Sequence, residues 1–316
     1  MQVPSVKTLE EYRGIYHRED LWRPVVEEIR GRHMLPDGPC VRGGDGTHIV
    51  YLAGPSHVVK LFVPLFEQDF VAERLVGKHL EGRLGVATPA IVAEGEIGGW
   101  RYLIMTRVLG RPLEEVWSDM SEDDHQRIVA EVGQMIALVR ALSLGGLEPL
   151  AVDWAAFLSA QAATAAARHQ VSGLPWDPAQ EIPAYLESLA PLRSEDFQPV
   201  LLLSDITREH VLVSRSGGSW RMVSYVDFGD AMIGHPDYEL VAPGLDIARG
   251  DRGLLRTLLL SAGYPEAALD ETLRRRLTAY TLMHRYVRFE DVIAAVPKAG
   301  AASNLDELAS VIWPVC

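Results

Sequence analysis

Three polar side chains in the second half of the chain, Asp205, His210 and Asp227, flank short apolar runs. Asp205 and His210 belong to a loop that enters a strand predicted over 211–213, and Asp227 follows the returning strand over 222–226. Pairing within this hairpin would bring Asp227 back beside His210. Phosphoryl transfer needs such a set, because one Asp accepts the proton of the attacking hydroxyl while a second Asp and a neighbouring side chain hold Mg²⁺ against nucleotide phosphates.

Each of these residues also has a simpler, structural explanation. Asp205 would cap a turn, Asp227 would cap the end of a strand, and His210 would be a hydrogen-bonded histidine of the core. For any one of them alone that explanation is preferable. The three together, with the triplet Asp227-Phe228-Gly229, favour catalysis, because spaced motifs in the right context are much rarer by chance.

Lys60 lies in the apolar run 58–62, which is predicted as a strand. A buried ammonium group is costly unless it meets an anion. Phosphate oxygens of a nucleotide would supply that anion, with Glu73 on the following helix as the counter-charge that steadies the lysine. Glu67 and Asp69 compete for this pairing. The alternative is a lysine on an edge strand that points to solvent.

Gly43, Gly44 and Gly46 precede the hairpin that carries Lys60. Glycines let backbone N–H groups approach phosphates closely, so these three residues are candidates for nucleotide binding. Such a run is also an ordinary turn, and only its position supports the interpretation. It is not a P-loop, which needs a Lys and a Ser or Thr directly after the glycines.

The order of predicted elements divides the chain near Gly110. Before it we predict a helical lead over 5–35, a hairpin over 48–62, a helix over 67–81, a turn over 94–99 and a strand over 100–105. After it the pattern is mostly helical, with helices capped by Ser121 and Asp153 and a long one over about 269–292, interrupted by the short strands near Asp205. The predicted lobes are therefore 1–109 and 110–316.

Composition excludes several classes of protein. The 316 residues carry 43 acidic and 30 basic side chains, a net charge of −13, which argues against a nucleic-acid partner because such a partner needs a basic surface. The two cysteines, Cys40 and Cys316, cannot form a disulfide framework, and no apolar run is long enough to span a membrane. We expect a cytoplasmic, monomeric protein without a membrane partner.

The motifs resemble those of the aminoglycoside phosphotransferase family, small-molecule kinases that share the protein-kinase fold. The matching segments are 58–62, 102–105 with the linker to Gly110, 204–213 and 225–230. Within the family, the chain is most similar to the hygromycin B 7″-O-phosphotransferase branch. The resemblance implies an α+β, protein-kinase-like fold of two lobes: a small β-rich N-lobe with helices that binds nucleotide, and a larger, mainly helical C-lobe that holds catalytic and substrate-binding residues.

By this resemblance, Asp205 would be the catalytic base, and His210 and Asp227 would be the Mg²⁺ ligands. The family usually has His-Gly-Asp where this chain has Leu203-Ser204-Asp205, which affects the rigidity of the loop more than its chemistry. It usually has Asn where this chain has His210. Because Mg²⁺ prefers oxygen ligands, a nitrogen ligand at this place would relax the preference toward Mn²⁺.

The resemblance also implies how the nucleotide is held. Lys60, paired with Glu73, would clamp the phosphates of ATP or GTP. Backbone groups of Thr106 and Val108 would hold the nucleotide base between the lobes.

Aminoglycosides are polycations, so the resemblance implies carboxylates around the acceptor. The candidates are Asp230, Asp237, Glu239, Glu290 and Asp291. Glu290 and Asp291 would lie at the end of the last long helix, where a solvated helix end explains them equally well. Glu239 would instead be structural if it matches an acidic position with which the family holds this loop.

The sequence thus predicts an aminoglycoside O-phosphotransferase, with hygromycin B as the first candidate acceptor and antibiotic resistance as the implied role. Two other classes stay open. One is a metabolic kinase of the same fold that acts on a sugar or an amino alcohol. The other is an inactive binding module, suggested by Leu203 and His210 and opposed by the retained Lys60, Asp205 and Asp227.

Overall fold

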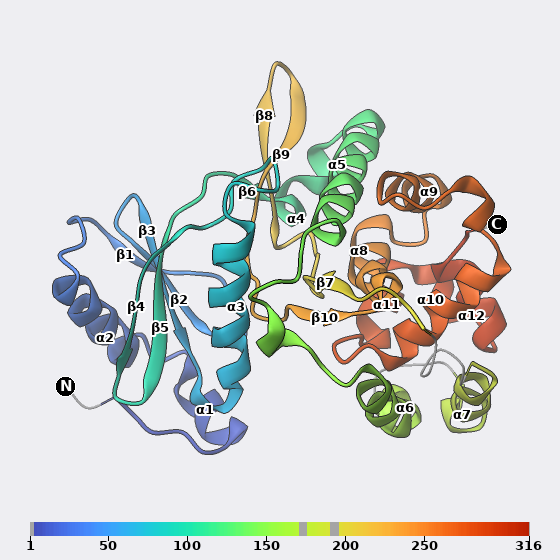
Figure 1. Cartoon of the computed structure of the whole chain (residues 1–316), viewed down its shortest axis with the longest axis horizontal. Helices are drawn as coiled ribbons and strands as arrows, with labels where there is room; N and C mark the ends of the chain where they lie inside the picture. The colour runs from blue at the N-terminus through green and yellow to red at the C-terminus, as the bar shows by residue number, and fades with distance from the viewer. Residues whose placement is uncertain (1–2, 171–175, 190–195, 316) are drawn as a thin grey trace. The chain divides into compact units, whose positions relative to one another are not determined.

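The computed structural model describes residues 3–170, 176–189 and 196–315. The chain forms two compact units (Figure 1). The N-terminal unit comprises Met1–Gly110 together with Ser224–Ala231, and the C-terminal unit comprises Arg111–Val223 and Met232–Cys316. The segment 224–231 thus belongs to the N-terminal unit although it follows much of the helical part in sequence. The predicted lobe boundaries, 1–109 and 110–316, stay a prediction.

A five-stranded antiparallel sheet forms the centre of the N-terminal unit. Its strands are β1 (Cys40–Arg42), β2 (Ile49–Ala53), β3 (His57–Phe62), β4 (Ile91–Ile97) and β5 (Trp100–Thr106). They lie in the order β1-β2-β3-β5-β4, so β3 has partners on both sides, and the hairpin predicted over 48–62 is confirmed. The turn predicted over 94–99 is wrong over 94–97 and right at Gly98 and Gly99. Strand β4 continues to Ile97, and the chain turns at Gly98 and Gly99, which both have positive φ.

Helices cover both faces of this sheet (Figure 1). The helical lead consists of α1 (Leu9–Tyr16) and α2 (Glu19–Arg32), and the helix predicted over 67–81 is α3 (Glu67–Leu80). Val59 of β3 packs in a core with Ile29 of α2, whereas Phe62 packs against Phe70 of α3. Because side chains alternate along a strand, Lys60 points toward the side of α3.

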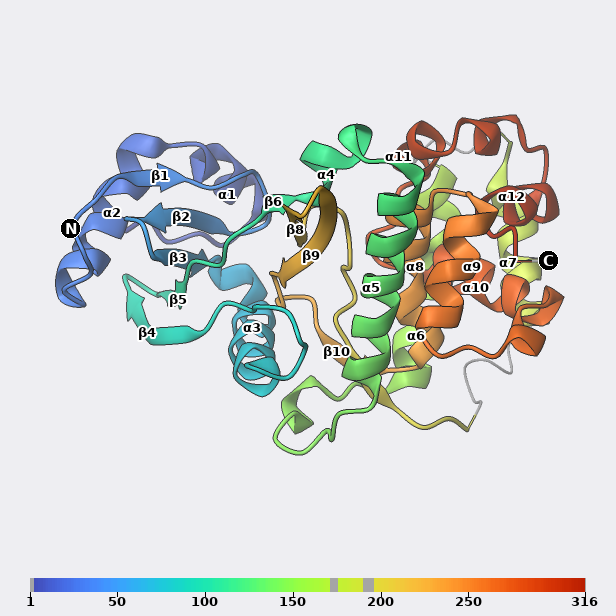
Figure 2. The same cartoon turned by 90° about the horizontal axis from the view of Figure 1, so that it is seen from above.

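The C-terminal unit is mostly helical. Its helices are α4 (Leu113–Val116), α5 (Glu122–Arg140), α6 (Trp154–Gln170), α7 (Pro178–Ser188), α8 (Val241–Pro243), α9 (Arg252–Ser261), α10 (Glu271–Met283), α11 (Phe289–Ala295) and α12 (Leu305–Ile312). Strand β7 (Val200–Leu202) pairs with β10 (Met232–Gly234), and β8 (Val211–Ser216) lies between β6 (Arg111–Pro112) and β9 (Ser219–Tyr225). Figure 2 shows α5 beside α9. The predicted caps Ser121 and Asp153 accept backbone N–H groups of α5 and α6.

The long helix predicted over 269–292 is wrong. Helix α10 ends before His284, whose backbone is extended (φ −70°, ψ 127°). The buried His284 ring accepts the N–H of Tyr286 at Nδ1 (3.4 Å), which turns the chain out of the helix. Glu290 and Asp291 therefore lie in the first turn of α11 rather than at the end of a long helix.

A π-helical turn over Gly244–Ala248 leads into Arg249, whose backbone is left-handed (φ +51°). A Cβ atom on Gly244 would lie 2.2 Å from the ring of Trp313, so only glycine fits there. Trp313 is itself held, because its Nε1 donates to Oγ1 of Thr281 (3.0 Å). The turn is thus backed by a fixed aromatic ring.

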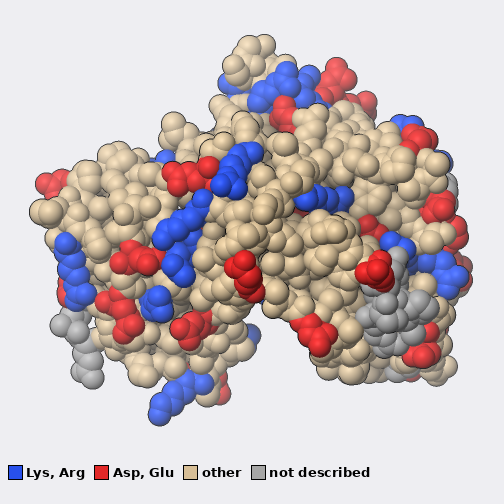
Figure 3. All heavy atoms as spheres, in the orientation of Figure 1, with Lys and Arg blue, Asp and Glu red and all other residues tan. Residues whose placement is uncertain are grey.

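Two surface properties bear on the kinds of partner that the sequence predicts. Among the described residues, no helix combines the length and the apolar character that crossing a bilayer requires. On the face that Figure 3 shows, acidic and basic side chains are interspersed among the described residues. The net charge of −13 is therefore not gathered into one patch on this face.

His169 predicts how stability depends on pH. The ring lies buried at the end of α6, where Nε2 donates to the carbonyl of Leu282 (2.8 Å), and burial lowers its pKa to about 4. The unfolded chain protonates His169 near pH ~6.5 and the folded chain only near pH 4. The stability that comes from keeping the ring neutral is therefore lost as the pH falls between these two values.

The variant His169→Gln keeps a hydrogen-bond donor at this position but cannot titrate. The unfolding free energy of the parent relative to this variant should therefore fall by about 1.4 kcal/mol per pH unit below pH ~6. Urea titrations check this, and a constant difference would contradict it.

Candidate active site

Lys60 is held by two carboxylates inside the N-terminal unit. Its Nζ lies 2.8 Å from Oε2 of Glu73 and 2.9 Å from Oδ1 of Asp227. Lys60 and Glu73 are only 4% and 2% exposed. The predicted ion pair with Glu73 is therefore present, and the alternative of a lysine that faces solvent is wrong. The competing acids, Glu67 and Asp69, pair with an arginine and a histidine instead.

This cluster carries one more acid than it has bases. Burial opposes the charge on Lys60, but Asp227 and Glu73 outweigh it and raise the pKa of the ammonium. Burial also raises the pKa of Glu73, to about 7, against the lowering effect of Lys60. Lys60 and Glu73 are buried, whereas the Asp227 side chain is 37% exposed, so a cation that reaches Asp227 from solvent would compensate the excess negative charge.

The backbone around Asp227 explains how a residue so distant in sequence reaches Lys60. Ser224 forms a parallel bridge with Ala87, and the N–H of Tyr225 donates to the carbonyl of Ala87 (3.1 Å). Asp227 then adopts a left-handed conformation (φ +70°), and the N–H of Gly229 donates to its Oδ1 (3.1 Å). Left-handed backbone is costly for most residues but is tolerated by Asp. The bridge to Ala87 and the hydrogen bond from Gly229 together fix the position of this carboxylate.

Two of the three glycines predicted to bind phosphate, Gly43 and Gly46, already donate their N–H groups to the protein. The N–H of Gly43 donates to the carbonyl of Val50 (2.8 Å), and the N–H of Gly46 donates to Oη of Tyr16 (2.7 Å). A Cβ atom on Gly44 would meet open space. Phosphate binding through the amides of Gly43 and Gly46 would require these hydrogen bonds to open, so their role stays a prediction.

Thr106 is the last residue of β5, and Val108 lies two residues further along the chain. The N–H of Thr106 donates to the carbonyl of Ala90 (2.8 Å), and its Oγ1 accepts the N–H of Ala90 (2.9 Å). Val108 is half-buried in the linker that leads to Gly110. Their contact with a nucleotide base stays a prediction.

Asp205 and His210 share one loop of the C-terminal unit, between β7 and β8. Nδ1 of His210 lies 2.9 Å from the carbonyl oxygen of Asp205 and 3.3 Å from its Oδ2. Because the carbonyl can only accept, Nδ1 carries the proton in the neutral ring. The lone pair is then on Nε2, which is the atom that could ligate a metal ion. The predicted place of Asp227 beside His210 stays a prediction.

Glu239 holds the backbone just before Asp205. Its two carboxylate oxygens accept the N–H groups of Leu203 and Ser204, each at 3.0 Å, and the side chain is buried. Burial raises the pKa of Glu239 to about 7, although these N–H groups favour its charged form. Ser204 has a left-handed backbone (φ +66°), so this grip stabilises a conformation that serine seldom adopts.

The structure separates the five acids that were predicted around the acceptor. Besides Glu239, Asp237 is buried and its Oδ2 accepts from Arg276 (3.1 Å). Asp230 belongs to the N-terminal unit. Glu290 forms an ion pair with Arg288 on the surface. Among the five, Asp291 lines the cavity that contains Asp205.

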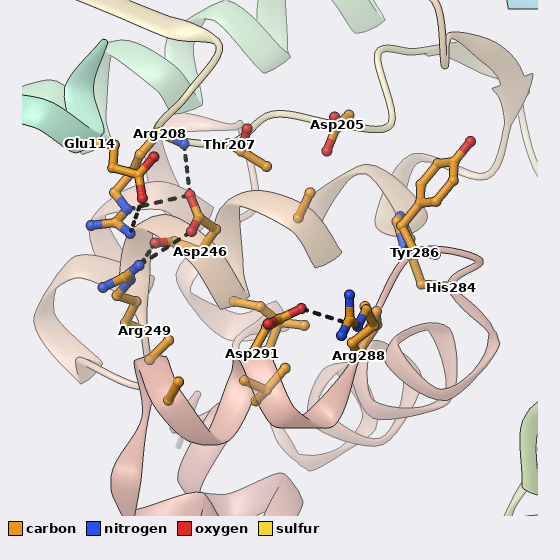
Figure 4. Close-up of a pocket in the computed structure, with 16 residues that line it drawn as sticks. Glu114, Asp205, Thr207, Arg208, Asp246, Arg249, His284, Tyr286, Arg288 and Asp291 are labelled. Carbon is orange, nitrogen blue, oxygen red and sulfur yellow. Dashed lines mark hydrogen bonds and ion pairs between the residues drawn. The ribbon is translucent and has the colours of Figure 1, made fainter. Parts of the chain in front are cut away.

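That cavity lies within the C-terminal unit and has a volume of about 590 Å³ (Figure 4). Asp205 lies on one side, with Asp291 across from it. The residues that sequence reasoning missed are mainly charged or aromatic: Glu114, Arg208, Asp246, Arg249, His284, Tyr286 and Arg288. The spacing of Asp246 and Arg249 would have suggested a helical ion pair, but nothing in the sequence joins them to Asp205.

The residues fit a magnesium ion. Asp227 has carboxylate oxygens, which Mg²⁺ prefers, and His210 has a ring nitrogen, Nε2, that can ligate a metal ion. Within the described part of the chain, no three His, Cys, Asp or Glu side chains form a group that could hold a metal ion. Mg²⁺ at nucleotide sites needs no such cage, since one or two protein ligands, phosphates and water complete its octahedron.

Comparison with known families identifies the chain. The model of the phosphotransferase enzyme family matches residues 44–288, most of the 316 residues. The chain belongs to this family. The resemblance stated from the motifs is confirmed at that level, and the closer likeness to the hygromycin B branch stays a prediction.

Solved structures agree with this family fold. The GDP and kanamycin complex of APH(2″)-IIIa has a TM-score of 0.69 at 16% identity and covers 92% of this chain and 97% of that one. The aminoglycoside phosphotransferase APH(4)-Ia scores 0.62 at 16% identity, covering 92% and 98%. Macrolide 2′-phosphotransferase MphH from Brachybacterium faecium scores 0.55 at 17% identity, covering 92% and 97%. The predicted α+β fold, with a β-rich N-terminal sheet and a helical C-terminal part, is confirmed.

The Lys60 cluster predicts a specific pattern of stability. The variant Lys60→Met leaves two carboxylates uncompensated and should lower the unfolding free energy by about 3–5 kcal/mol. The double variant Lys60→Met/Glu73→Gln removes one of these charges and should recover part of that loss without recovering turnover. Guanidinium titrations and a turnover assay check both, and a single variant as stable as the parent would contradict the interpretation.

Glu239 predicts a graded effect on the loop that carries Asp205. The variant Glu239→Ala leaves two buried N–H groups without acceptors, at about 1–3 kcal/mol each, whereas Glu239→Gln keeps one acceptor and should lose less. The control Glu266→Ala removes an exposed acid paired with Arg256 and should change stability by less than about 1 kcal/mol. Equal stability of all three variants in urea titrations would show that the hydrogen bonds from Leu203 and Ser204 to Glu239 do not stabilise the loop.

Proposed function

We propose that this protein is a small-molecule kinase that transfers the γ-phosphoryl group of ATP or GTP to a hydroxyl of an aminoglycoside, with hygromycin B as the first candidate. The observation that carries the proposal is the buried cluster of Lys60, Glu73 and Asp227 in a chain of the phosphotransferase enzyme family. An exposed lysine would not need such support. A lysine held between two acids is oriented for an anionic ligand.

In this proposal Lys60 binds phosphate oxygens of the nucleotide and neutralises part of their charge. Asp205 accepts the proton of the acceptor hydroxyl as its oxygen attacks the γ-phosphorus, and the nucleoside diphosphate leaves. His210 orients Asp205, with its Nδ1 at 3.3 Å from the carboxylate. His210 and Asp227 would hold Mg²⁺, which supplies charge neutralisation when bound, and Mn²⁺ would suit the nitrogen ligand.

Several observations support an aminoglycoside as the acceptor. Solved neighbours of the same fold include a kanamycin complex and a gentamicin complex. The net charge of −13 is compatible with a cationic ligand as well as with a neutral one. We further propose that the protein acts as a cytoplasmic monomer without nucleic-acid or membrane partners.

A metabolic kinase is the second candidate function. The cavity contains Arg208, Arg249 and Arg288 as well as acids, and arginines favour an acceptor that is neutral or carries an anionic group. An inactive module is disfavoured, because a protein without the reaction has no reason to keep Lys60 and Asp205.

The experiment is a coupled assay of nucleoside diphosphate release from ATP and from GTP, with Mg²⁺ and a panel of aminoglycosides. The variant Asp205→Asn should lower turnover by at least ~100-fold, as expected for loss of a general base, with nucleotide affinity kept. The control Glu266→Gln changes an exposed acid outside the cavity and should leave turnover unchanged. Turnover of Asp205→Asn at the level of the parent would refute the assignment.

A further inference from the structure

The charged side chains of the cavity are paired with one another. Its four acids are Glu114, Asp205, Asp246 and Asp291, and its three arginines are Arg208, Arg249 and Arg288. Each acid other than Asp205 has an arginine partner within ion-pair distance, and Asp205 lies beside His210. The cavity is therefore close to neutral, in contrast to the protein as a whole, which carries −13.

Asp246 is the most fully compensated of these acids. Its Oδ2 accepts the backbone N–H of Arg208 (2.7 Å) and lies 3.4 Å from Nε of the same residue. Its Oδ1 lies 3.4 Å from Nη2 of Arg249. The left-handed backbone of Arg249 turns its side chain back, so that Nε also donates to the carbonyl of Asp246 (2.7 Å). The pair is thus held by backbone as well as by side-chain contacts.

The other wall of the cavity has the same kind of compensation. Arg288 directly precedes α11, with its Nε 3.7 Å from Oδ2 of Asp291, and it also pairs with Glu290. Figure 4 shows Arg288 and Asp291 turned toward one another. Glu290 and Asp291, in the first turn of α11, are therefore already paired with the guanidinium of Arg288.

Apart from Thr207, the remaining lining is apolar or aromatic. It includes Leu245, Val287 and Val292, with the half-exposed ring of Tyr286 beside them. Apolar side chains contact the carbon skeleton of a ligand and select little among its hydroxyl groups. They offer an ammonium group no hydrogen-bond acceptor, so burying an ammonium group against them is costly.

We infer that the acceptor is a hydroxyl compound with fewer ammonium groups than kanamycin or gentamicin, and that Arg249 and Arg288 disfavour more highly charged polyamines in the cavity. This inference rests on the proposed function and narrows its substrate class. A polycation would meet a guanidinium of like charge at both walls, next to carboxylates that already have an arginine partner. Specificity here comes from repulsion of the wrong ligand as much as from attraction of the right one.

Binding and turnover can be measured separately. The acceptors are a macrolide with a single amine as the low-charge probe, hygromycin B as a probe of intermediate charge, and kanamycin and gentamicin as polyamines. Calorimetric affinity with a non-hydrolysable nucleotide and Mg²⁺ is compared with kcat/KM, at about 0.02 M and about 0.2 M KCl. We expect low-charge acceptors to bind at least ~10-fold tighter, with affinities that change less than ~2-fold with salt.

The variant Arg288→Gln releases Asp291, whereas Arg249→Gln leaves Asp246 with Arg208 as its arginine partner. Arg288→Gln should tighten polyamine binding about 10-fold and make it salt-dependent, because the freed carboxylate then meets an ammonium directly. Arg249→Gln should shift polyamine affinity in the same direction by a smaller factor. The control Arg256→Gln removes an exposed arginine that pairs with Glu266 outside the cavity and should change neither property.

Tight, salt-sensitive binding of polyamines to the parent would overturn the inference, and so would unchanged polyamine affinity in both arginine variants. If low-charge acceptors bind and are not phosphorylated, the inference stands and the proposed kinase function fails. If polyamines are the better substrates, the kinase function stands and the inference fails.

Discussion

One ammonium group connects the parts of the N-terminal unit. Lys60 can be buried only because two carboxylates compensate it, and these come from α3 and from the segment after β9. The interior position of β3, between β2 and β5, keeps the lysine off the sheet edge, and the packing of Phe62 against Phe70 keeps α3 within reach. Loss of Lys60 would leave the buried carboxylate of Glu73 without its cationic partner, which costs more than the ion pair itself contributes. The cost of a buried charge without a partner therefore disfavours other arrangements of Lys60, Glu73 and Asp227.

Each unit presents one carboxylate of the candidate site from left-handed backbone: the predicted metal ligand Asp227 in one, and the predicted base Asp205 in the other. Asp227 is itself left-handed, and Ser204 is left-handed directly before Asp205. In both places a buried acid holds neighbouring amides: Glu73 accepts the N–H of Phe228 (3.0 Å), and Glu239 accepts those of Leu203 and Ser204. Strain of this kind persists only where surrounding groups over-determine it. The two buried acids thus do the same work in different units, with no substrate contact needed to explain either.

Local patterns in the sequence were enough for much of the fold and for one part of the site. The apolar run 58–62 predicts a strand, and the cost of burying a lysine predicts an acidic partner, for which Glu73 is preferred over Glu67 and Asp69. What failed depends on tertiary contacts that a sequence does not display. His284 ends α10 because its ring is buried and accepts a backbone N–H, although the periodicity continues past it. Asp237 and Glu239 have the composition of a ligand site, yet they bind the protein itself. The arginines of the cavity come from separate segments, so no spacing joins them.

The contact between Gly244 and Trp313 has a consequence for how this protein can evolve. No side chain larger than hydrogen fits at Gly244, so the backbone of the turn that carries Asp246 is closed to gradual change. The side chains that face the cavity are under no such restriction, since several are partly exposed and form ion pairs of little energetic weight. Selection can therefore exchange them one at a time at small cost in stability. A rigid wall with replaceable side chains lets lineages diverge in the compounds they modify while they keep one catalytic framework.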